Sequence, residues 1–293
     1  MKREYPCLVS GLPELITDFD AKKIDFAALR NEIKESIHPS DYELVKALFY
    51  PYDNQNLLNT LLKKNIAFNN KGNFEQNTLA EKITNRCGLP KYMHDFIEIF
   101  ENDKNEDYPD DILKLYERDR ENLLQTLFYD ETLKMKNRFI QQWFTFDRDL
   151  RNIQAAIIAR RLQIDASAYF VGQHAEILAK STAADFSLSS EIDWMHRIVQ
   201  IAEIQDACER ELKIDLFRWE KIDEFSVYNY FDIDAVLSFM QKADIAERWL
   251  SLDRQKGKEM FKKLIGDLMK TCDTQKVFNK KDIKNNEIKN QKI

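Results

Sequence analysis

A stripe of large apolar side chains, spaced alternately four and three residues apart, constrains the fold of this chain more than any other feature. The stripe consists of Phe139, Trp143, Phe146, Leu150, Ile153 and Ile157. This spacing places the side chains on one face of an α-helix, as in the buried seam between packed helices. An aromatic ligand box is the alternative interpretation. We predict a long helix buried against other helices.

Helix start and stop signals divide the chain before this stripe. Asp25 is expected to cap a helix that runs to about residue 36. Ser40 followed by Glu43 forms a capping-box pattern that opens a second helix. Because proline lacks an N–H group, we expect Pro51 to end that helix and Asp53 to begin the next one.

Similar signals cover the rest of the chain. Ser189–Ser190 is expected to open one long helix from Glu191 to about Leu212, and Asp232 or Asp234 to cap another that runs to about Leu250. The other expected helices cover residues 77–86, two long stretches after the acidic linker 101–111, and residues 253–271. The one stretch typical of a strand is Tyr5–Ser10. With only 6 glycines and 6 prolines in 293 residues, the sequence predicts an all-α protein.

Charge and hydropathy exclude several classes of partner. The 44 basic residues are outnumbered by 50 acidic ones, which disfavours nucleic acid binding, since phosphates select clustered Lys and Arg. The longest internal apolar run, Ala155–Ala159, is far shorter than the ~20 residues of a membrane span, so we expect no direct membrane insertion. No signal peptide is evident, and the four cysteines are scattered, which favours a cytoplasmic protein.

No pattern for chemistry stands out. The chain has no glycine-rich phosphate loop and no dinucleotide fingerprint. Its four histidines, His38, His94, His174 and His196, never pair at metal-ligand spacing. We therefore expect no catalytic residue, cofactor or metal, and no enzyme. A hydrolase with an unusual all-α site is the weakest of the alternatives.

Three segments of the chain look alike. Each has aromatic residues, then an aspartate, then Asn or Ala three residues later, then an apolar run. The pairs are Asp53 with Asn56, Asp149 with Asn152, and Asp232 with Ala235, and the aspartates lie 96 and 83 residues apart. Helix N-caps alone produce such patterns, and Asp149 lies inside a continuous helical stripe. The repeat nevertheless suggests three related helical units.

We divide the chain accordingly. The predicted units are residues 1–104 with an N-terminal extension, 105–187 with long helices, and 188–271. Residues 272–293 carry six lysines against three acidic residues and few large apolar ones, so we expect a disordered basic tail.

The two ends of the chain resemble a known family. The segment from Tyr5 to Pro13, YPCLVSGLP, is similar to the opening of a bacterial family of unknown function that is encoded among V-type ATPase genes. The segment AERWLSLD at 246–253, followed by Gly257, Phe261 and Ile265, also fits that family. The family is distantly similar to the C subunit of archaeal and V-type ATPases, named d in the eukaryotic enzyme, which repeats an Asp-x-x-Asn-apolar pattern.

This resemblance implies a fold and a role. The fold would be three related helical bundles in a funnel, on the cytoplasmic face of the membrane rotor ring. The protein would couple the central stalk to that ring during ion transport, without chemistry of its own. The residues that the resemblance marks are Tyr5, Gly11, Leu12, Pro13, Asp53, Asn56, Asp149, Asn152, Asp232, Arg248, Trp249, Asp253 and Gly257. A free-standing cytoplasmic adaptor or regulator that binds a protein partner through a helix groove is the alternative.

Overall fold

The computed structural model describes residues 3–13, 15, 25–102 and 110–252, with the backbone alone for 110–118 and 250–252. Every regular element in these ranges is a helix, which confirms the all-α prediction. The elements are α1 (Pro6–Gly11), α2 (Phe26–Ser36), α3 (Pro39–Leu61), α4 (Gln76–Asn85), α5 (Lys91–Asn102), α6 (Asp110–Thr132), α7 (Arg138–Leu162), η1 (Ser167–Tyr169), α8 (Ala175–Lys180), α9 (Met195–Ala202), α10 (Ala207–Ser226) and α11 (Ile233–Leu252).

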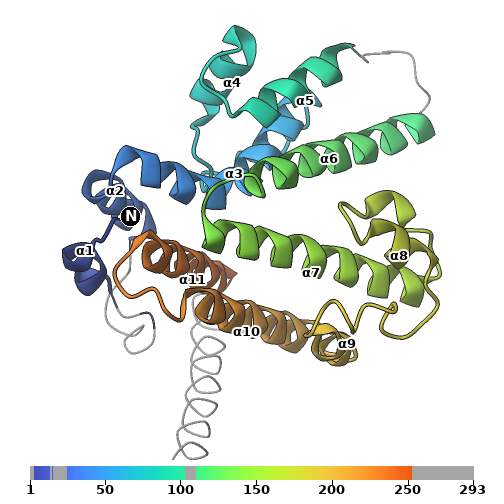
Figure 1. The fold of residues 1–293 in the computed structure, drawn as a ribbon. Coiled ribbons are helices and arrows are strands. Elements are labelled where there is room, and N and C mark those ends of the chain that lie inside the picture. The colour runs from blue at the N-terminus through green and yellow to red at the C-terminus, as the bar shows by residue number, and fades with distance from the viewer. Residues whose placement is uncertain (1–2, 14, 16–24, 103–109, 253–293) are drawn as a thin grey trace, which may run out of the picture.

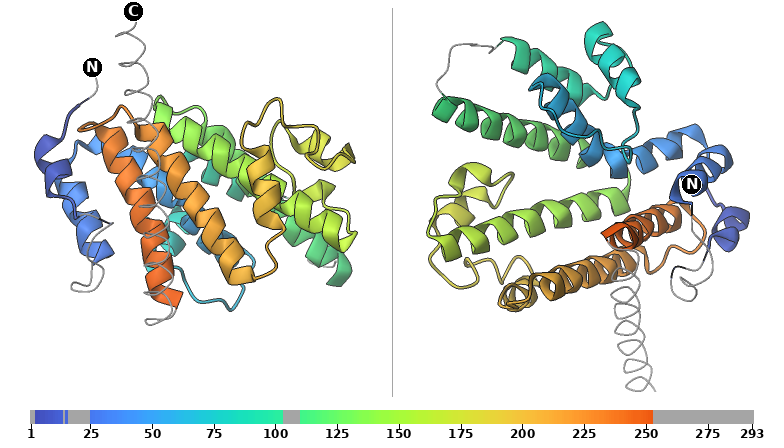
Figure 2. Two further views of the ribbon diagram at one scale, coloured as in Figure 1. Left: turned by 90° about the horizontal axis from the view of Figure 1, so that it is seen from below. Right: turned by 180° about the vertical axis from the view of Figure 1, so that it is seen from behind.

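The long helices form a row in which each packs on the next. Helices α5, α6, α7, α10 and α11 pack one on the next in this order, and Figure 1 shows α5, α6 and α7 from top to bottom with α11 and α10 below them. Helix α3 lies behind this row, where it contacts α6, α7 and α11 (Figure 2). One continuous cluster of buried side chains runs from Leu15 to Trp249 and includes residues of all three predicted units. A threefold relation between those units stays a prediction.

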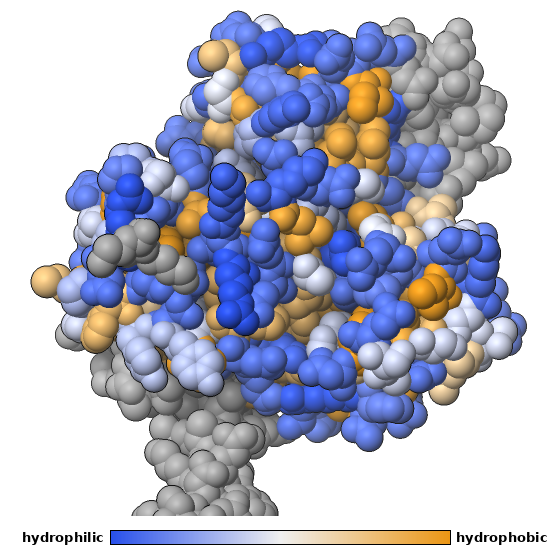
Figure 3. Space-filling view, viewed as in Figure 1, coloured by the Kyte–Doolittle hydropathy of each residue, from blue (hydrophilic) through white to orange (hydrophobic). Residues whose placement is uncertain are grey.

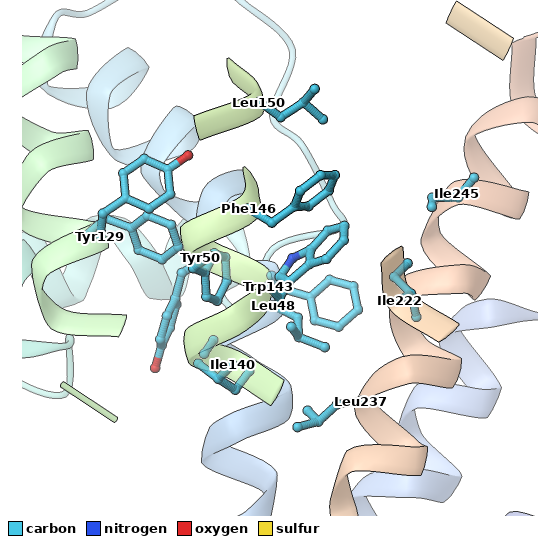
Figure 4. Close-up of a cluster of buried hydrophobic side chains, with 14 of the residues drawn as sticks. Leu48, Tyr50, Tyr129, Ile140, Trp143, Phe146, Leu150, Ile222, Leu237 and Ile245 are labelled. Carbon is cyan, nitrogen blue, oxygen red and sulfur yellow. The ribbon is translucent and has the colours of Figure 1, made fainter. Parts of the chain in front are cut away.

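The predicted stripe forms the centre of this core. Phe139, Phe146, Leu150 and Ile153 are buried on α7, and Ile157 packs at the edge of the same cluster. The Phe146 ring lies 5.3–6.1 Å, between ring centroids, from four other aromatic rings. Figure 4 shows Trp143 and Phe146 pointing from α7 toward Ile222 and Ile245. Packing between helices, rather than a ligand box, accounts for the stripe.

The prediction that Pro51 ends a helix was wrong. Helix α3 is capped by His38 and continues through Pro51 to Leu61, so Asp53 lies in the helix interior rather than at its start. The proline ring is exposed, and buried residues on both sides, including Tyr50 and Leu57, pack on the core. This packing outweighs the local cost of an internal proline, which is ~3 kcal/mol.

The prediction of one helix over 191–212 was also wrong. The chain instead forms α9 and α10, and the Asp206 side chain caps α10 by accepting from the Glu209 N–H. Two arginines satisfy the carbonyl groups at the break: Arg161 donates to the carbonyl of Ala202, and Arg210 to that of Ile204. These hydrogen bonds from arginine side chains replace the helical hydrogen bonds that are lost between α9 and α10, and they stabilise the break.

Smaller predictions had mixed outcomes. Asp25 caps α2 by accepting from the Ala28 N–H, as expected. The strand-like segment Tyr5–Ser10 is instead mostly helix, with one isolated β-bridge between Glu4 and Asp232 beside it. The predicted helix 253–271 and the tail 272–293 lie outside the described residues. Within the described chain, no helix is long and apolar enough to cross a membrane.

Truncating the central ring tests this description of the core. We expect Phe146→Ala to lower the free energy of unfolding by about 3–5 kcal/mol, because a buried aromatic is replaced by a cavity. The measurement is urea unfolding followed by circular dichroism. Tyr228→Ala is the control, since Tyr228 is 87% exposed and should change stability by less than about 0.5 kcal/mol. Equal effects of the two substitutions would contradict the assignment.

Candidate functional site: loops held by buried aspartates and asparagines

The first predicted pair, Asp53 and Asn56, holds the loop that follows α3. The Asn56 side chain donates to the carbonyl of Asn69 and accepts from its N–H, both at 2.9 Å. The Asp53 carboxylate accepts from the backbone N–H groups of Asn73 and Phe74 and from the Asn73 side chain. Asp53 and Asn56 are both buried. They bind backbone N–H and C=O groups of the loop that have no partner within a helix or strand.

The second pair, Asp149 and Asn152, holds the loop that follows α7. Asn152 donates to the carbonyl of Val171 at 2.7 Å and accepts from its N–H at 3.2 Å. Asp149 accepts from Arg148, and its Oδ1 lies 3.3 Å from Nδ1 of His174. The residues Arg148, Asp149, Asn152 and His174 are each at most 6% exposed.

The two pairs share their arrangement. In each, the asparagine binds both backbone polar groups of one loop residue, and the aspartate one turn earlier reaches residues slightly farther along the same loop. A glycine lies at each contact. A Cβ on Gly72 would stand 2.3 Å from Oδ1 of Asp53, and one on Gly172, where φ is +83°, would stand 2.9 Å from Arg148. The loops thus approach the helices at distances that only glycine permits.

The third aspartate of the predicted repeat is placed differently. Asp232 lies just before α11, where it accepts from the Asp234 N–H and the Asn229 side chain. The neighbouring Asp234 is buried and accepts from Asn137, the residue that caps α7. These contacts join the starts of α7 and α11 rather than holding a following loop.

Sequence reasoning missed a buried aspartate on α10. Asp215 is 0% exposed, and its Oδ2 accepts from Nε1 of Trp249 at 2.8 Å. Arg248 lies 3.3 Å from the same carboxylate and donates to Glu211. Arg248 and Trp249, two of the residues that the family resemblance marks, therefore attach α11 to α10. Asp215 is followed by Leu216 and Phe217 without the Asn three residues later, so the Asp-x-x-Asn pattern could not find it.

A polar groove borders the first held loop. It encloses about 650 Å³ between α2, residues 70–76 and α11. Arg30 lines it, donates to the carbonyls of Lys71 and Gly72, and stacks 3.8 Å from the centroid of the Phe49 ring. Across the groove, Lys71 forms ion pairs with Asp244 at 2.9 Å and Glu247 at 3.0 Å. These contacts connect the first part of the chain to α11.

Burial dominates the titration of these acidic groups. It raises the pKa of Asp53 and of Asp215, although hydrogen bonds to Asp53 and the arginines near Asp215 partly oppose the shift. Burial and the carboxylate of Asp244 raise the pKa of Tyr52, whose hydroxyl donates to Asp244. Burial acts to lower the pKa of Lys71, but Asp244 and Glu247 outweigh it and raise that pKa. Lys71 thus lies between two carboxylates of the groove wall that favour its charged form.

The marked N-terminal residues lie apart from this groove. The Tyr5 hydroxyl donates to Asp41 at 2.5 Å, and its backbone N–H donates to the carbonyl of Phe231. Gly11, Leu12 and Pro13 lie at the end of α1, with Gly11 and Pro13 exposed.

Two of the marked residues cannot be placed. Asp253 and Gly257 lie outside the described residues. Within the described ranges, no three His, Cys, Asp or Glu side chains are grouped so that they could hold a metal ion. The described contacts are those of a structural site that binds its own backbone.

Adding one methyl group tests the contact between Asp53 and its loop. We expect Gly72→Ala to lower the free energy of unfolding by about 1–3 kcal/mol, because the new Cβ meets the Asp53 carboxylate. In an Asp53→Ala background the same substitution should cost much less. Gly11→Ala is the matched control, since nothing lies within 4 Å of its added Cβ. Additive costs of the two substitutions in a double-mutant cycle would contradict this contact.

The pH dependence of stability tests the burial of Asp215. Since burial raises its pKa above the ordinary value of 3.8, the folded chain retains a proton that the unfolded chain releases. The contribution of Asp215 to stability is therefore complete below pH 3.8 and is lost as the pH rises through the raised pKa. The free energy of unfolding of the wild type, minus that of Asp215→Asn, should fall over this window.

The control for this experiment is Asp193→Asn, because that carboxylate is 84% exposed. The free energy of unfolding of the wild type, minus that of Asp193→Asn, should not fall between pH 3.8 and the raised pKa of Asp215. A difference curve for Asp215→Asn that rises with pH would mean that Arg218 and Arg248 outweigh burial.

Comparisons with known proteins place the chain in a family. An uncharacterized protein of Chlamydia muridarum (strain MoPn / Nigg) is 26% identical in an alignment 167 residues long that covers 53% of this chain. The match spans 62% of the length of that relative. No solved structure matches the chain. A family model described as a protein of unknown function, DUF2764, matches residues 1–272. The chain therefore belongs to the DUF2764 family.

Proposed function

We propose that this chain is a non-catalytic component of a bacterial V-type ATPase or ATP synthase, similar in role to the C subunit of such enzymes. In this role it couples the central stalk to the membrane rotor ring, on the cytoplasmic face of the membrane, during ion transport. The observation that carries the proposal is the pair of Asp-x-x-Asn sites with the same contacts, at Asp53 with Asn56 and at Asp149 with Asn152. They match the pattern that the C subunit repeats between its helical units, and they support the three-bundle funnel that the resemblance implies.

The mechanical properties of the chain support the proposal. A coupling part must transmit force without deforming, and the loops after α3 and α7 are fastened to helix interiors by buried hydrogen bonds. The pairing of Lys71 with Asp244 and Glu247 connects distant parts of the chain. Such connections resist separation of the predicted units.

Exposed aromatic side chains favour a protein partner. Val227, Tyr228, Tyr230 and Phe231, in the turn between α10 and α11, are 45–87% exposed. Monomeric surfaces rarely expose such groups together, whereas interfaces are enriched in them. We assign this aromatic turn to contact with the stalk or the ring. The same turn would also serve the alternative role, a free-standing adaptor, so a direct test of the partner is needed.

Affinity purification from gently solubilised membranes tests the proposal. A tagged chain should recover stalk and rotor-ring proteins of the ATPase in constant proportion. Tyr228→Ala combined with Tyr230→Ala should reduce this recovery about tenfold or more, because interface aromatics often contribute more than ~1.4 kcal/mol each. Ile66→Ala is the matched control, since Ile66 is 57% exposed and distant in sequence from the turn.

Recovery of the intact ATPase without this chain, or of this chain with other proteins alone, would overturn the proposal. The second result would instead favour the adaptor.

A further inference from the structure

The aromatic turn between α10 and α11 is held in one shape from within. The Asn229 side chain donates to Asp232 at 2.6 Å and to Asp234 at 3.2 Å, and Asp234 is buried. Asn229 therefore anchors the turn to the start of α11. The residues on either side of it, Tyr228 and Tyr230, are 87% and 72% exposed. Their exposure belongs to a turn whose base is fixed by hydrogen bonds.

The N-terminal segment fastens the same turn from outside. Glu4 forms an isolated antiparallel β-bridge with Asp232, and the N–H of Tyr5 donates to the carbonyl of Phe231 at 2.6 Å. The Tyr5 hydroxyl donates to Asp41 on α3. Figure 1 shows the turn on the same side of the molecule as α1. Because the backbone of the turn is already fixed, little conformational entropy is lost when a partner packs on its exposed rings.

Two ion pairs at the end of α10, beside the turn, direct their negative members to solvent. Lys242 donates to Asp223, and Lys221 donates to Glu224 at 2.8 Å. The two carboxylate side chains are 56% and 59% exposed, whereas the lysine side chains are 17% and 10% exposed. A partner that approaches this surface therefore meets carboxylate oxygens before it meets the lysines.

A third carboxylate lies on the other flank of the turn. Glu4 is exposed, and it forms no ion pair with another residue that the structure describes. Its basic neighbour Arg3 donates to Asp41 at 3.0 Å. Figure 3 shows the turn at the lower left of this face as pale and apolar atoms beside strongly hydrophilic ones. The whole chain carries a formal net charge of −6, so its long-range field also attracts cations.

We propose that the aromatic turn and these three carboxylates bind a cationic protein surface, on which lysine or arginine side chains border an apolar hollow. This rests on the proposed coupling role and deepens it: the stalk or ring protein that contacts the turn presents such a surface. Its cations pair with the carboxylates and stack on the rings of Tyr228 and Tyr230, whose faces attract positive charge. Val227 and Phe231 enter the hollow.

The same charges disfavour other occupants of this surface. A second copy of the chain would bring like carboxylates together, and a membrane of anionic lipids would also face them with like charge. A purely apolar protein surface would remove water from the carboxylates without offering them a partner, which is costly. A cationic protein surface avoids both costs.

Rebinding of the full-length chain to membranes tests the charge of the partner. The purified, tagged chain is mixed with membranes from cells that lack its gene. After gentle solubilisation the chain is recovered, and the stalk and rotor-ring proteins that accompany it are quantified. We expect recovery by the wild type to fall about tenfold or more between about 0.05 and 0.5 M salt, because screening weakens exposed charge pairs.

Variants separate the charged contacts from the aromatic ones. Glu4→Gln, Asp223→Asn and Glu224→Gln in one chain should lower recovery about fivefold or more at low salt. This triple variant should also lose most of the salt dependence. Tyr228→Ala combined with Tyr230→Ala should lower recovery at every salt concentration but keep the salt dependence, since the carboxylates remain.

The matched control removes the same number of charges elsewhere. Glu81→Gln, Glu98→Gln and Glu176→Gln in one chain change three exposed glutamates on α4, α5 and α8. Figure 1 shows these helices away from the turn. This control has the same net charge as the triple variant and should be recovered like the wild type. Thermal unfolding confirms that each variant is folded.

The possible failures are distinguishable. If the wild type recovers no stalk or ring protein, the coupling role fails and the cationic partner fails with it. If the wild type recovers them but the triple variant behaves like its control, or recovery rises with salt, the coupling role stands and the cationic partner is wrong. Binding to vesicles of phosphatidylcholine and phosphatidylglycerol, or self-association in ultracentrifugation, would also overturn the proposal if Tyr228→Ala with Tyr230→Ala abolished it.

Discussion

Hydrogen bonds from the interiors of long helices to the backbone of the following loops are the constraint on which this structure depends. An irregular loop that packs on a core must satisfy its own N–H and C=O groups, since water no longer reaches them. Asn56 and Asn152 each satisfy both groups of one loop residue, and Asp53 accepts three further donors. Because these side chains are buried, the loops have one arrangement rather than many.

The aromatic core and the polar contacts stabilise the same arrangement. The rings around Phe146 bring α7 against α10, and Asp215 attaches α10 to α11 through Trp249. Lys71 then joins α11 to the loop that Asp53 holds. The contacts of α7 with α10 and of α11 with the loop after α3 link elements that are distant along the chain, so the helices form one continuous body. A body of this kind is suited to transmitting force, which is why the coupling role is favoured over the adaptor.

Helix α3 connects α11 to the loop that borders the groove. The Tyr52 hydroxyl on α3 donates to Asp244, which lies in the groove wall and pairs with Lys71. One turn further on, Asn56 holds the loop that forms the other side of the groove.

The sequence by itself determined the helical class, the long helix α7 and the cap of α2 at Asp25, because each depends on local periodicity or on a side chain beside its own helix. It also marked Asp53, Asn56, Asp149 and Asn152 as members of a repeated pattern, but not as buried side chains that hold the following loops. Only the tertiary structure decided that α3 continues through Pro51, that α9 and α10 are separate, and that Asp215 is buried beside Trp249. These outcomes rest on partners from distant parts of the chain, whose packing outweighs local preference and leaves no signal in neighbouring residues.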